Sequence, residues 1–185
     1  MKKIYIHGAN SSSISFNYIR HFDDDDSVVI DYNCNESSVN EVADDVCKII
    51  KKYDNCALIG HSMGGVIAHS VCMKSPIPSK LITISSPFGG ISVTSVLRYL
   101  YPTVRMYHDM DPMTIHTPSI ASCAWLAIIT TGGEAAWMNE PNDGVVTIRS
   151  QKFIKPTKMV ESNLNHFEIL LSDKTIECID NFLLM

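Results

Sequence analysis

The stretch LIGHSMGG, residues 58–65, decides the fold because it places a tight glycine-rich turn directly after an apolar run. That run, CALIGH at residues 56–61, is typical of a buried strand, and a helical pattern follows it. The residues from Gly60 to Gly64 match G-x-S-x-G, in which a strand-to-helix turn holds the central residue at strained backbone angles above the sheet. This context favours such a turn at Ser62 over an ordinary glycine-rich turn.

Five further short apolar runs, rich in β-branched residues, alternate with helical patterns along the chain. This alternation is the signature of a parallel sheet with helices on both faces, and the runs are near-continuous, as in strands buried on both sides. We predict a single-domain three-layer α/β/α sandwich over residues 1–185, with about six mostly parallel strands. The other predicted strands are residues 3–7, 27–32, 81–86, 125–131 and 158–162.

Three helices are predicted from caps and periodicity. Ser38 and Glu41 have the spacing of a capping box, and apolar residues at helical spacing follow them. A second helix is predicted over residues 64–74 and a third from about Asp173, with Ser172 as its N-cap. The residues expected to face the sheet from this last helix are Ile176, Ile179 and Phe182 or Leu183.

Residues 88–122 have the weakest pattern in the chain. A helix is predicted over Val93–Leu100, followed by a loop that contains proline. The segment RMYHDMDPMTIHTPS, residues 105–119, matches no motif. We interpret 88–122 as a possible small cap or pocket wall.

Composition and charge exclude several classes of protein. With 45% hydrophobic and 19% charged residues, the 185-residue chain is typical of a globular protein that buries its own core. Fifteen Lys and Arg against twenty Asp and Glu give a net charge of −5, so no nucleic acid is expected as a partner. The acidic run at residues 23–26 is interpreted as a solvated loop rather than a calcium site, because calcium loops intersperse acids with other ligands.

The cysteines and the N-terminus indicate the compartment. The six cysteines lie mostly inside apolar patterns and form no CxxC pair, so we expect buried free thiols at Cys34, Cys47, Cys56, Cys72, Cys123 and Cys178. The N-terminal sequence MKKIYIH has an apolar run too short for a secretory signal, and no apolar stretch has the roughly 18 residues of a membrane span. We expect a cytoplasmic protein with no integral membrane association.

Ser62 needs partners if it is a nucleophile, because serine requires a base, usually a histidine held by a carboxylate. In this architecture the acid and then the base follow the serine in the chain, each after a later strand. Asp143 lies in a turn after the fifth predicted strand, and His166 lies in a loop after the sixth. We interpret Ser62, Asp143 and His166 as the candidate catalytic residues.

Other residues compete for two of these roles. Asp143 in PNDG is also a good turn residue for local reasons, and Asp109 and Asp111 are rival carboxylates nearer the fourth strand. Only His166 lies downstream of both Ser62 and Asp143. The histidines interpreted as locally hydrogen-bonded residues are His7, His61 and His69.

Acyl transfer at this serine would also need hydrogen-bond donors for a developing oxyanion. The backbone N–H of Met63, directly after Ser62, is one candidate, and the N–H of Ala9 in the loop HGAN is the other. Gly8 would let this loop approach the substrate. The helix that begins at the turn adds free N–H groups and a positive dipole end.

Five segments in this order resemble one superfamily: IYIHGANSSSISFNYI, GHSMGG, LITISSPFGG, NDGVV and NH. The chain is similar to the α/β-hydrolases, and among them to the minimal lidless bacterial lipases and esterases. The resemblance covers nearly the whole chain. It implies a six-stranded parallel core, an exposed catalytic serine, no cofactor or metal, and hydrolysis of carboxylic esters.

The hypothesis from the sequence is a serine ester hydrolase that acts on a small-molecule ester or acyl substrate. Two alternatives stay open. A thioesterase or amidase would use the same three residues, because the chemistry up to the acyl-enzyme is shared. A noncatalytic binding protein could use the same scaffold, although the complete set of candidate residues disfavours it.

Overall fold

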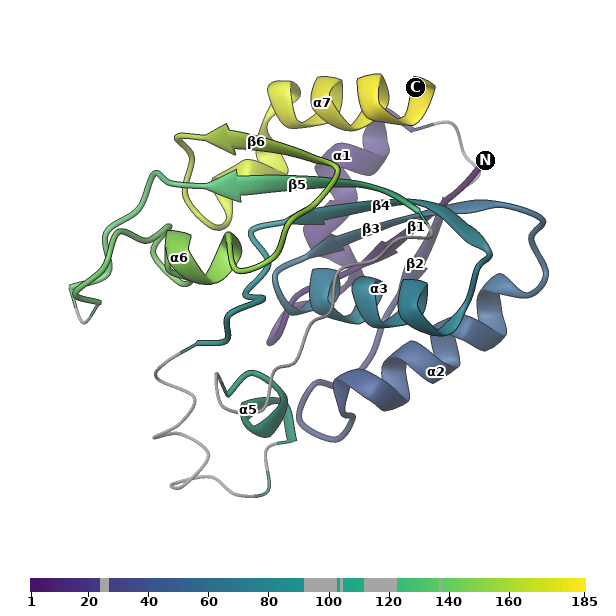
Figure 1. The fold of residues 1–185 in the computed structure, drawn as a ribbon, viewed down its shortest axis with the longest axis horizontal. Coiled ribbons are helices and arrows are strands. Elements are labelled where there is room, and N and C mark those ends of the chain that lie inside the picture. The colour runs from purple at the N-terminus through teal and green to yellow at the C-terminus, as the bar shows by residue number, and fades with distance from the viewer. Residues whose placement is uncertain (24–26, 92–102, 104, 112–122, 137) are drawn as a thin grey trace.

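The fold is built on a six-stranded sheet. A computed structural model describes residues 1–23, 27–91, 103, 105–111, 123–136 and 138–185. The strand order is β2-β1-β3-β4-β5-β6 and every neighbouring pair is parallel (Figure 1), so the predicted parallel α/β sheet is confirmed. The strands are β1 (Lys2–Ile6), β2 (Ser27–Ile30), β3 (Cys56–His61), β4 (Pro78–Ile84), β5 (Ala124–Thr130) and β6 (Lys158–Ser162).

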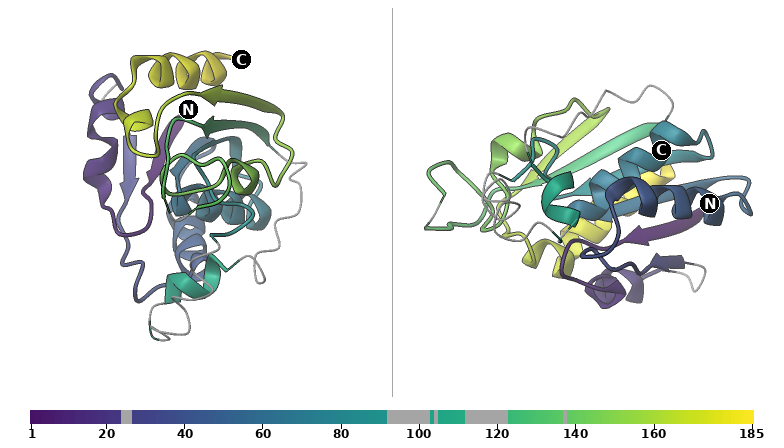
Figure 2. Two further views of the ribbon diagram at one scale, coloured as in Figure 1. Left: turned by 90° about the vertical axis from the view of Figure 1, so that its left-hand side faces the viewer. Right: turned by 90° about the horizontal axis from the view of Figure 1, so that it is seen from below.

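Helices cover both faces of the sheet and complete the predicted three layers (Figure 2). Helices α2 (Val39–Ile50) and α3 (Met63–Lys74) pack on one face, and α1 (Asn17–His21) and α7 (Asp173–Leu184) pack on the other. Alternate residues of each strand pack against the two helical layers, because successive side chains point to opposite faces of the sheet. Thus Leu58 packs with α2 and α3, whereas Ile59 packs with α1 and α7.

Four short helices complete the described structure. They are a 3-10 helix at Ser13–Phe16, α5 (Arg105–Asp109), α6 (Ile148–Gln151) and a 3-10 helix at Glu168–Leu171. The helix predicted over Val93–Leu100 lies outside the described residues, as does most of the segment interpreted as a cap or pocket wall.

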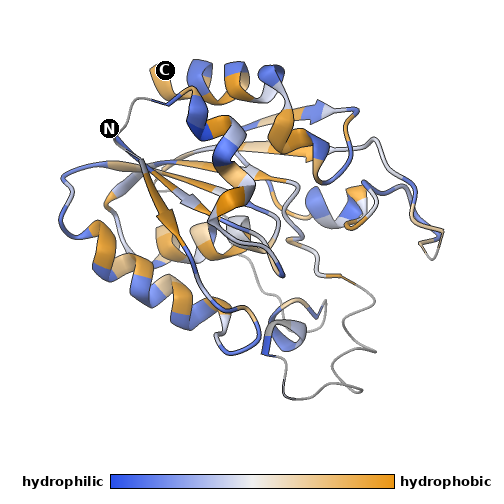
Figure 3. Cartoon of the chain, turned by 180° about the vertical axis from the view of Figure 1, so that it is seen from behind, coloured by the Kyte–Doolittle hydropathy of each residue, from blue (hydrophilic) through white to orange (hydrophobic). Residues whose placement is uncertain are grey.

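The capping box predicted at the start of α2 is confirmed. The Ser38 hydroxyl accepts the Glu41 N–H at 3.2 Å, and a Glu41 carboxylate oxygen accepts the Ser38 N–H at 2.8 Å. The apolar stripe of α2 faces the sheet (Figure 3), where Val42, Val46 and Ile50 are buried. Local sequence and tertiary packing therefore specify the same helix.

Two expectations about the last strand and the last helix need correction. Ser172 occupies the N-cap position of α7, but its side chain makes no capping hydrogen bond; its carbonyl oxygen accepts the first helical N–H groups instead. Helix α7 buries Thr175, Ile179 and Phe182, and Ile176 and Leu183 pack partly buried against the same core. Strand β6 is largely exposed rather than buried on both faces, because it stands at the edge of the sheet, where β5 is its one neighbour among the described strands.

Several other expectations can be compared with the described residues. All six cysteines are free; Cys34, Cys56 and Cys72 are buried, and the other three are partly exposed. Of the acidic run, the structure describes Asp23, which accepts hydrogen bonds from Lys3 and Tyr5. Within the described ranges, every helix is too short or too polar to cross a bilayer.

The capping box generates a stability prediction. Replacing Ser38 with alanine removes the acceptor for the Glu41 N–H, so we expect the free energy of unfolding to fall by about 1 kcal/mol. Urea denaturation of Ser38→Ala and wild type measures this difference. The neighbouring variant Ser37→Ala is the matched control; equal stability of all three proteins would contradict the assigned cap.

Candidate active site

Ser62 lies in a strained turn between β3 and α3. Its backbone has φ 54° and ψ −125°, a region that residues with a side chain rarely adopt. The Ser62 N–H donates to the carbonyl oxygen of Ile84 on β4 at 2.8 Å, and its own carbonyl accepts the Gly65 N–H at 3.0 Å. The strain predicted from G-x-S-x-G is therefore present, and hydrogen bonds on both sides hold it.

Two glycines permit this turn by close approach. A Cβ on Gly60 would overlap the carbonyl oxygen of Gly64, and a Cβ on Gly64 would overlap the carbonyl oxygen of Ile6 on β1. Because backbone atoms cannot move aside as a flexible side chain can, a larger residue at either position would separate α3 from the sheet. The sequence pattern therefore reflects packing as well as turn geometry.

The backbone around Ser62 carries the candidate oxyanion donors. Met63 is the first residue of α3, so its N–H has no acceptor inside the helix. Ala9 lies in the turn after β1, and a Cβ on the adjacent Gly8 would lie 2.9 Å from Ser62 Cβ. Ser62 itself is only 7% exposed, so the exposed serine that the family resemblance implied is wrong.

Asp143 and His166 form a buried pair. The Nδ1 atom of His166 lies 2.8 Å from Asp143 Oδ2, and the His166 N–H donates to the Asp143 carbonyl oxygen at 3.0 Å. Asp143 follows β5 and His166 follows β6, so both stand at the carboxyl edge of the sheet, as Ser62 does after β3. A carboxylate at Nδ1 places the ring proton there and leaves Nε2 as an acceptor.

Five donors surround the Asp143 carboxylate. Oδ1 accepts the N–H groups of Val145 and Val146 at 3.0 and 2.7 Å. Besides His166, Oδ2 accepts the Thr130 hydroxyl at 2.5 Å and the Gln151 amide at 3.1 Å. Burial would raise the pKa of Asp143, but the hydrogen bonds from His166, Thr130 and Val146 outweigh it and hold the pKa below its ordinary value.

Thr130 and Gln151 are site residues that the sequence reasoning missed. Gln151 holds the end of β5 twice: its Oε1 accepts the Thr130 N–H at 2.9 Å, and its Nε2 donates to the Thr130 carbonyl at 3.0 Å. The Thr130 hydroxyl also lies 2.8 Å from that of Ser85 after β4. In the sequence, the polar Thr130 at the end of an apolar strand could have indicated a site residue, whereas no sequence pattern pointed to Gln151.

His61 connects the serine turn to the histidine loop. It directly precedes Ser62, and its Nε2–H donates to the carbonyl oxygen of His166 at 2.8 Å. The rings of His61 and His166 lie 4.7 Å apart between centroids. Burial and the neighbouring His166 lower the pKa of His61 to about 3, so this donor stays neutral. The prediction of a local hydrogen bond at His61 is therefore wrong: the partner of Nε2 lies 105 residues away, and the buried Nδ1 has no hydrogen-bond partner among the described residues.

In the part of the chain that the structure describes, no hydrogen bond joins the side chain of Ser62 to that of His166. A contact between nucleophile and base is often long without substrate and tightens only when substrate binds. The structure thus pairs Asp143 with His166 directly and brings Ser62 to their loop through His61.

The two rival acids and the other histidines have different surroundings. Asp111 is fully buried, two residues after the end of α5. Asp109 Oδ2 accepts the Val39 N–H at 2.7 Å at the start of α2, so this carboxylate serves a helix end. His7 lies between Gly8 and Tyr32, and His69 packs among Phe88 and Trp125. The contact of His7 with Gly8 confirms the local hydrogen bond predicted for His7, whereas the ring contacts of His69 are with residues far along the chain.

Within the described ranges, no group of three or more His, Cys, Asp or Glu side chains is arranged to hold a metal ion.

Comparison with known proteins identifies structural relatives. No protein-family model and no curated protein matches the sequence. The Bacillus licheniformis lipase BlEst2 matches with a TM-score of 0.76 at 16% identity, over 98% of this chain and 91% of that one. The RedJ thioesterase from Streptomyces coelicolor gives 0.65 at 15% identity, over 98% and 84%. A thermophilic esterase from Thermogutta terrifontis gives 0.64 at 13%, over 99% and 89%. These likenesses establish the fold.

The neutral His61 generates a prediction about pH. The folded protein keeps His61 unprotonated down to about pH 3, whereas the unfolded chain protonates it near the ordinary histidine pKa of 6.5. Unfolding therefore takes up a proton at this residue below pH 6.5, and stability falls as the pH falls. Glutamine keeps a donor and does not titrate. Between pH 6 and pH 4, the free energy of unfolding of His61→Gln should therefore fall less steeply than that of wild type, by about 1.4 kcal/mol per pH unit.

Urea denaturation at pH 6, 5 and 4 measures this slope. His21→Gln, at an exposed histidine, is the matched control and should keep the slope of wild type. If His61→Gln and His21→Gln give the same slope, His61 is not held neutral in the folded state.

Proposed function

Since the chain has the α/β-hydrolase fold, we propose that it is a serine hydrolase that cleaves carboxylic esters with Ser62, His166 and Asp143. One observation carries this proposal: the strained Ser62 turn and the buried His166–Asp143 pair stand at the same edge of one sheet. A purely structural turn would not need a histidine held by a fully buried carboxylate in the neighbouring loop.

The first half of the reaction forms an acyl-enzyme. Ser62 Oγ attacks the ester carbonyl carbon while His166 Nε2 takes the hydroxyl proton. The negative charge that develops on the carbonyl oxygen is stabilised by the N–H groups of Met63 and Ala9. The tetrahedral intermediate collapses, the bond to the alcohol oxygen breaks, and His166 returns its proton to the departing alcohol.

The second half of the reaction releases the acid. A water molecule gives a proton to His166 and attacks the acyl carbon. When the second intermediate collapses, the bond between the acyl carbon and Ser62 Oγ breaks, His166 returns the proton to Oγ, and the carboxylic acid leaves. Throughout, Asp143 holds the Nδ1–H of His166 and stabilises the imidazolium that forms twice. All these groups belong to the chain, so the proposed reaction needs no cofactor.

A thioesterase is the second candidate, because one of the structural relatives is the RedJ thioesterase. The same residues would form the same acyl-enzyme, and the two activities differ only in the leaving group. Comparing the turnover of an oxygen ester and a thioester with identical acyl chains separates them.

The nucleophile generates a prediction. Ser62→Ala should abolish hydrolysis of p-nitrophenyl esters from acetate to palmitate and leave the folded state intact, because alanine removes only the attacking oxygen. Initial rates with both proteins measure the loss, and circular dichroism checks the fold. Activity of Ser62→Ala above a buffer blank would refute the assignment. A wild-type protein that neither turns over these esters nor reacts with a fluorophosphonate at Ser62 would be a binding protein.

The acid generates a second prediction. Asp143→Asn should lower kcat by about 10⁴, because an amide at this position favours the wrong tautomer of His166. Asp109→Asn is the matched control: it keeps an acceptor for Val39 and should retain activity close to wild type. If Asp109→Asn shows the larger loss, Asp143 is not the catalytic acid.

A further inference from the structure

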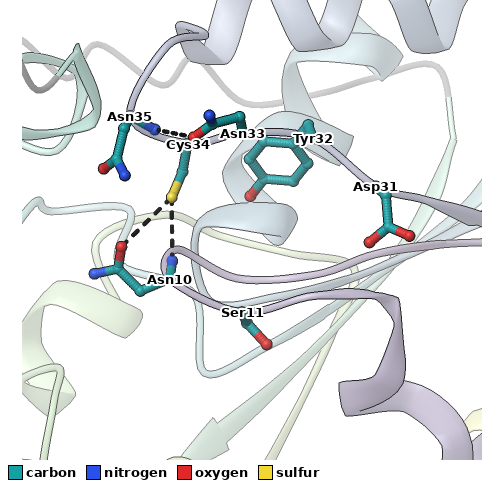
Figure 4. A pocket seen from close by; sticks show the side chains of 7 residues that line it. All are labelled: Asn10, Ser11, Asp31, Tyr32, Asn33, Cys34 and Asn35. Carbon is teal, nitrogen blue, oxygen red and sulfur yellow. Dashed lines mark hydrogen bonds between the residues drawn. The ribbon is translucent and has the colours of Figure 1, made fainter.

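A pocket lined mainly by residues with polar side chains lies beside the candidate active site. It has a volume of about 510 Å³ and is formed by the loops that follow β1 and β2 (Figure 4). None of the residues proposed for catalysis lines it. The lining residues are Asn10, Ser11, Asp31, Tyr32, Asn33, Cys34 and Asn35.

The pocket is near Ser62 because of the strand order. Strand β1 lies between β2 and β3, and neighbouring strands are about 4.8 Å apart, so the loop after β1 adjoins the turn after β3, and the loop after β2 lies next to it on the far side. A Cβ on Gly8 would lie 2.9 Å from Ser62 Cβ, and Asn10 follows two residues later. One wall of the pocket is therefore a direct continuation of the loop that contacts the serine.

Contacts from the β2 side hold this wall. Cys34 Sγ accepts the Asn10 N–H at 3.2 Å and donates to Asn10 Oδ1 at 3.6 Å, as Figure 4 shows. The Tyr32 hydroxyl donates to the His7 carbonyl oxygen at 2.8 Å, and the two rings stack with centroids 4.3 Å apart. The pocket and the loop that carries Ala9 thus form one pre-organised unit.

The lining selects the chemistry of a ligand. The side chains of Asn10, Asn33 and Asn35 provide amides, Ser11 provides a hydroxyl, and none of the seven lining residues is Lys or Arg. An anion would lack a positively charged partner, and a wholly apolar ligand would leave the amide and hydroxyl groups of the lining without hydrogen bonds. Hydroxyl groups both donate and accept, so they match amides and the Asp31 carboxylate.

We propose that this pocket binds the alcohol portion of the substrate when that alcohol carries free hydroxyl groups, as in a partly acylated polyol or sugar. The inference rests on the proposed ester hydrolysis, since the pocket adjoins the nucleophile but supplies no catalytic group. It assigns to the β1 and β2 loops a preference for the leaving group, independent of the length of the acyl chain.

Matched ester pairs test the preference. Glycerol 1-monobutyrate and n-propyl butyrate share the acyl chain and three alcohol carbons, and differ by two hydroxyl groups. We expect wild type to favour the glycerol ester by about tenfold in kcat/KM, as two additional hydrogen bonds to neutral groups would give. A second pair, glucose 6-butyrate and n-hexyl butyrate, distinguishes a sugar from a small polyol as the source of the hydroxyl groups.

Three variants connect the preference to the pocket. Asn10→Gly removes an amide while tolerating the φ of 51° at this position, and Asn35→Ala removes another. Both should lower the ratio of kcat/KM for the hydroxylated ester to that for the plain ester toward one. Using the ratio cancels any change in the catalytic rate common to both substrates. Asn181→Ala, at an exposed position on α7, is the matched control and should keep the wild-type ratio.

The outcomes separate this proposal from the proposed function. A preference for the hydroxylated member of either pair that falls in Asn10→Gly or Asn35→Ala supports the pocket. A wild-type ratio near one in both pairs, or a ratio that neither variant changes, overturns the pocket while ester hydrolysis stands. Absence of turnover of every ester together with absence of Ser62 labelling overturns the hydrolase itself, and this proposal with it.

Discussion

The backbone of Ser62, held at φ 54°, is the constraint on which the arrangement of the site depends. A residue with a side chain in such a region costs about 1–3 kcal/mol, which the surrounding structure must offset. The offset comes from the close packing of β1, β3 and α3, which Gly60 and Gly64 permit, and from the hydrogen bond between Ser62 and Ile84 on β4. The central strands and the first turn of α3 therefore form the core and also hold the Ser62 side chain in position.

A buried carboxylate is the second costly element, because ionised groups lose hydration when they are buried. Asp143 is fully buried, and two backbone N–H groups, Thr130, Gln151 and His166 together replace its water. Thr130 ends β5, Gln151 ends α6, and the two backbone N–H groups belong to the turn of Asp143 itself, so these four donors fix the orientation in which the carboxylate meets His166. The network thus compensates the lost hydration of Asp143 and orients the carboxylate so that it keeps the ring proton of His166 on Nδ1.

The carboxyl edge of the sheet brings these separate elements together. Parallel strands all end at the same edge, so loops that are distant in the chain become neighbours there. His61 bonds the His166 loop, and Tyr32 and Cys34 bond the His7–Asn10 loop, so that each loop of the site is held by another. Such mutual support lets short loops keep a fixed geometry around Ser62 and the adjacent pocket.

The sequence by itself determined the six strands, helix α2 with its capping box, and the turn at Ser62, because periodicity, caps and the G-x-S-x-G pattern are local properties of the chain. It also predicted Asp143 and His166 as acid and base by their order after the later strands, and the two side chains are hydrogen-bonded to each other. Only the tertiary structure decided that Asp109 serves α2, that β6 is an exposed edge strand, and that Ser62 is buried. It likewise revealed the contacts of Gln151, Cys34 and His61, whose partners lie 8 to 105 residues away in the chain. No local pattern encodes such contacts, since they exist only after the sheet has brought the loops to one edge.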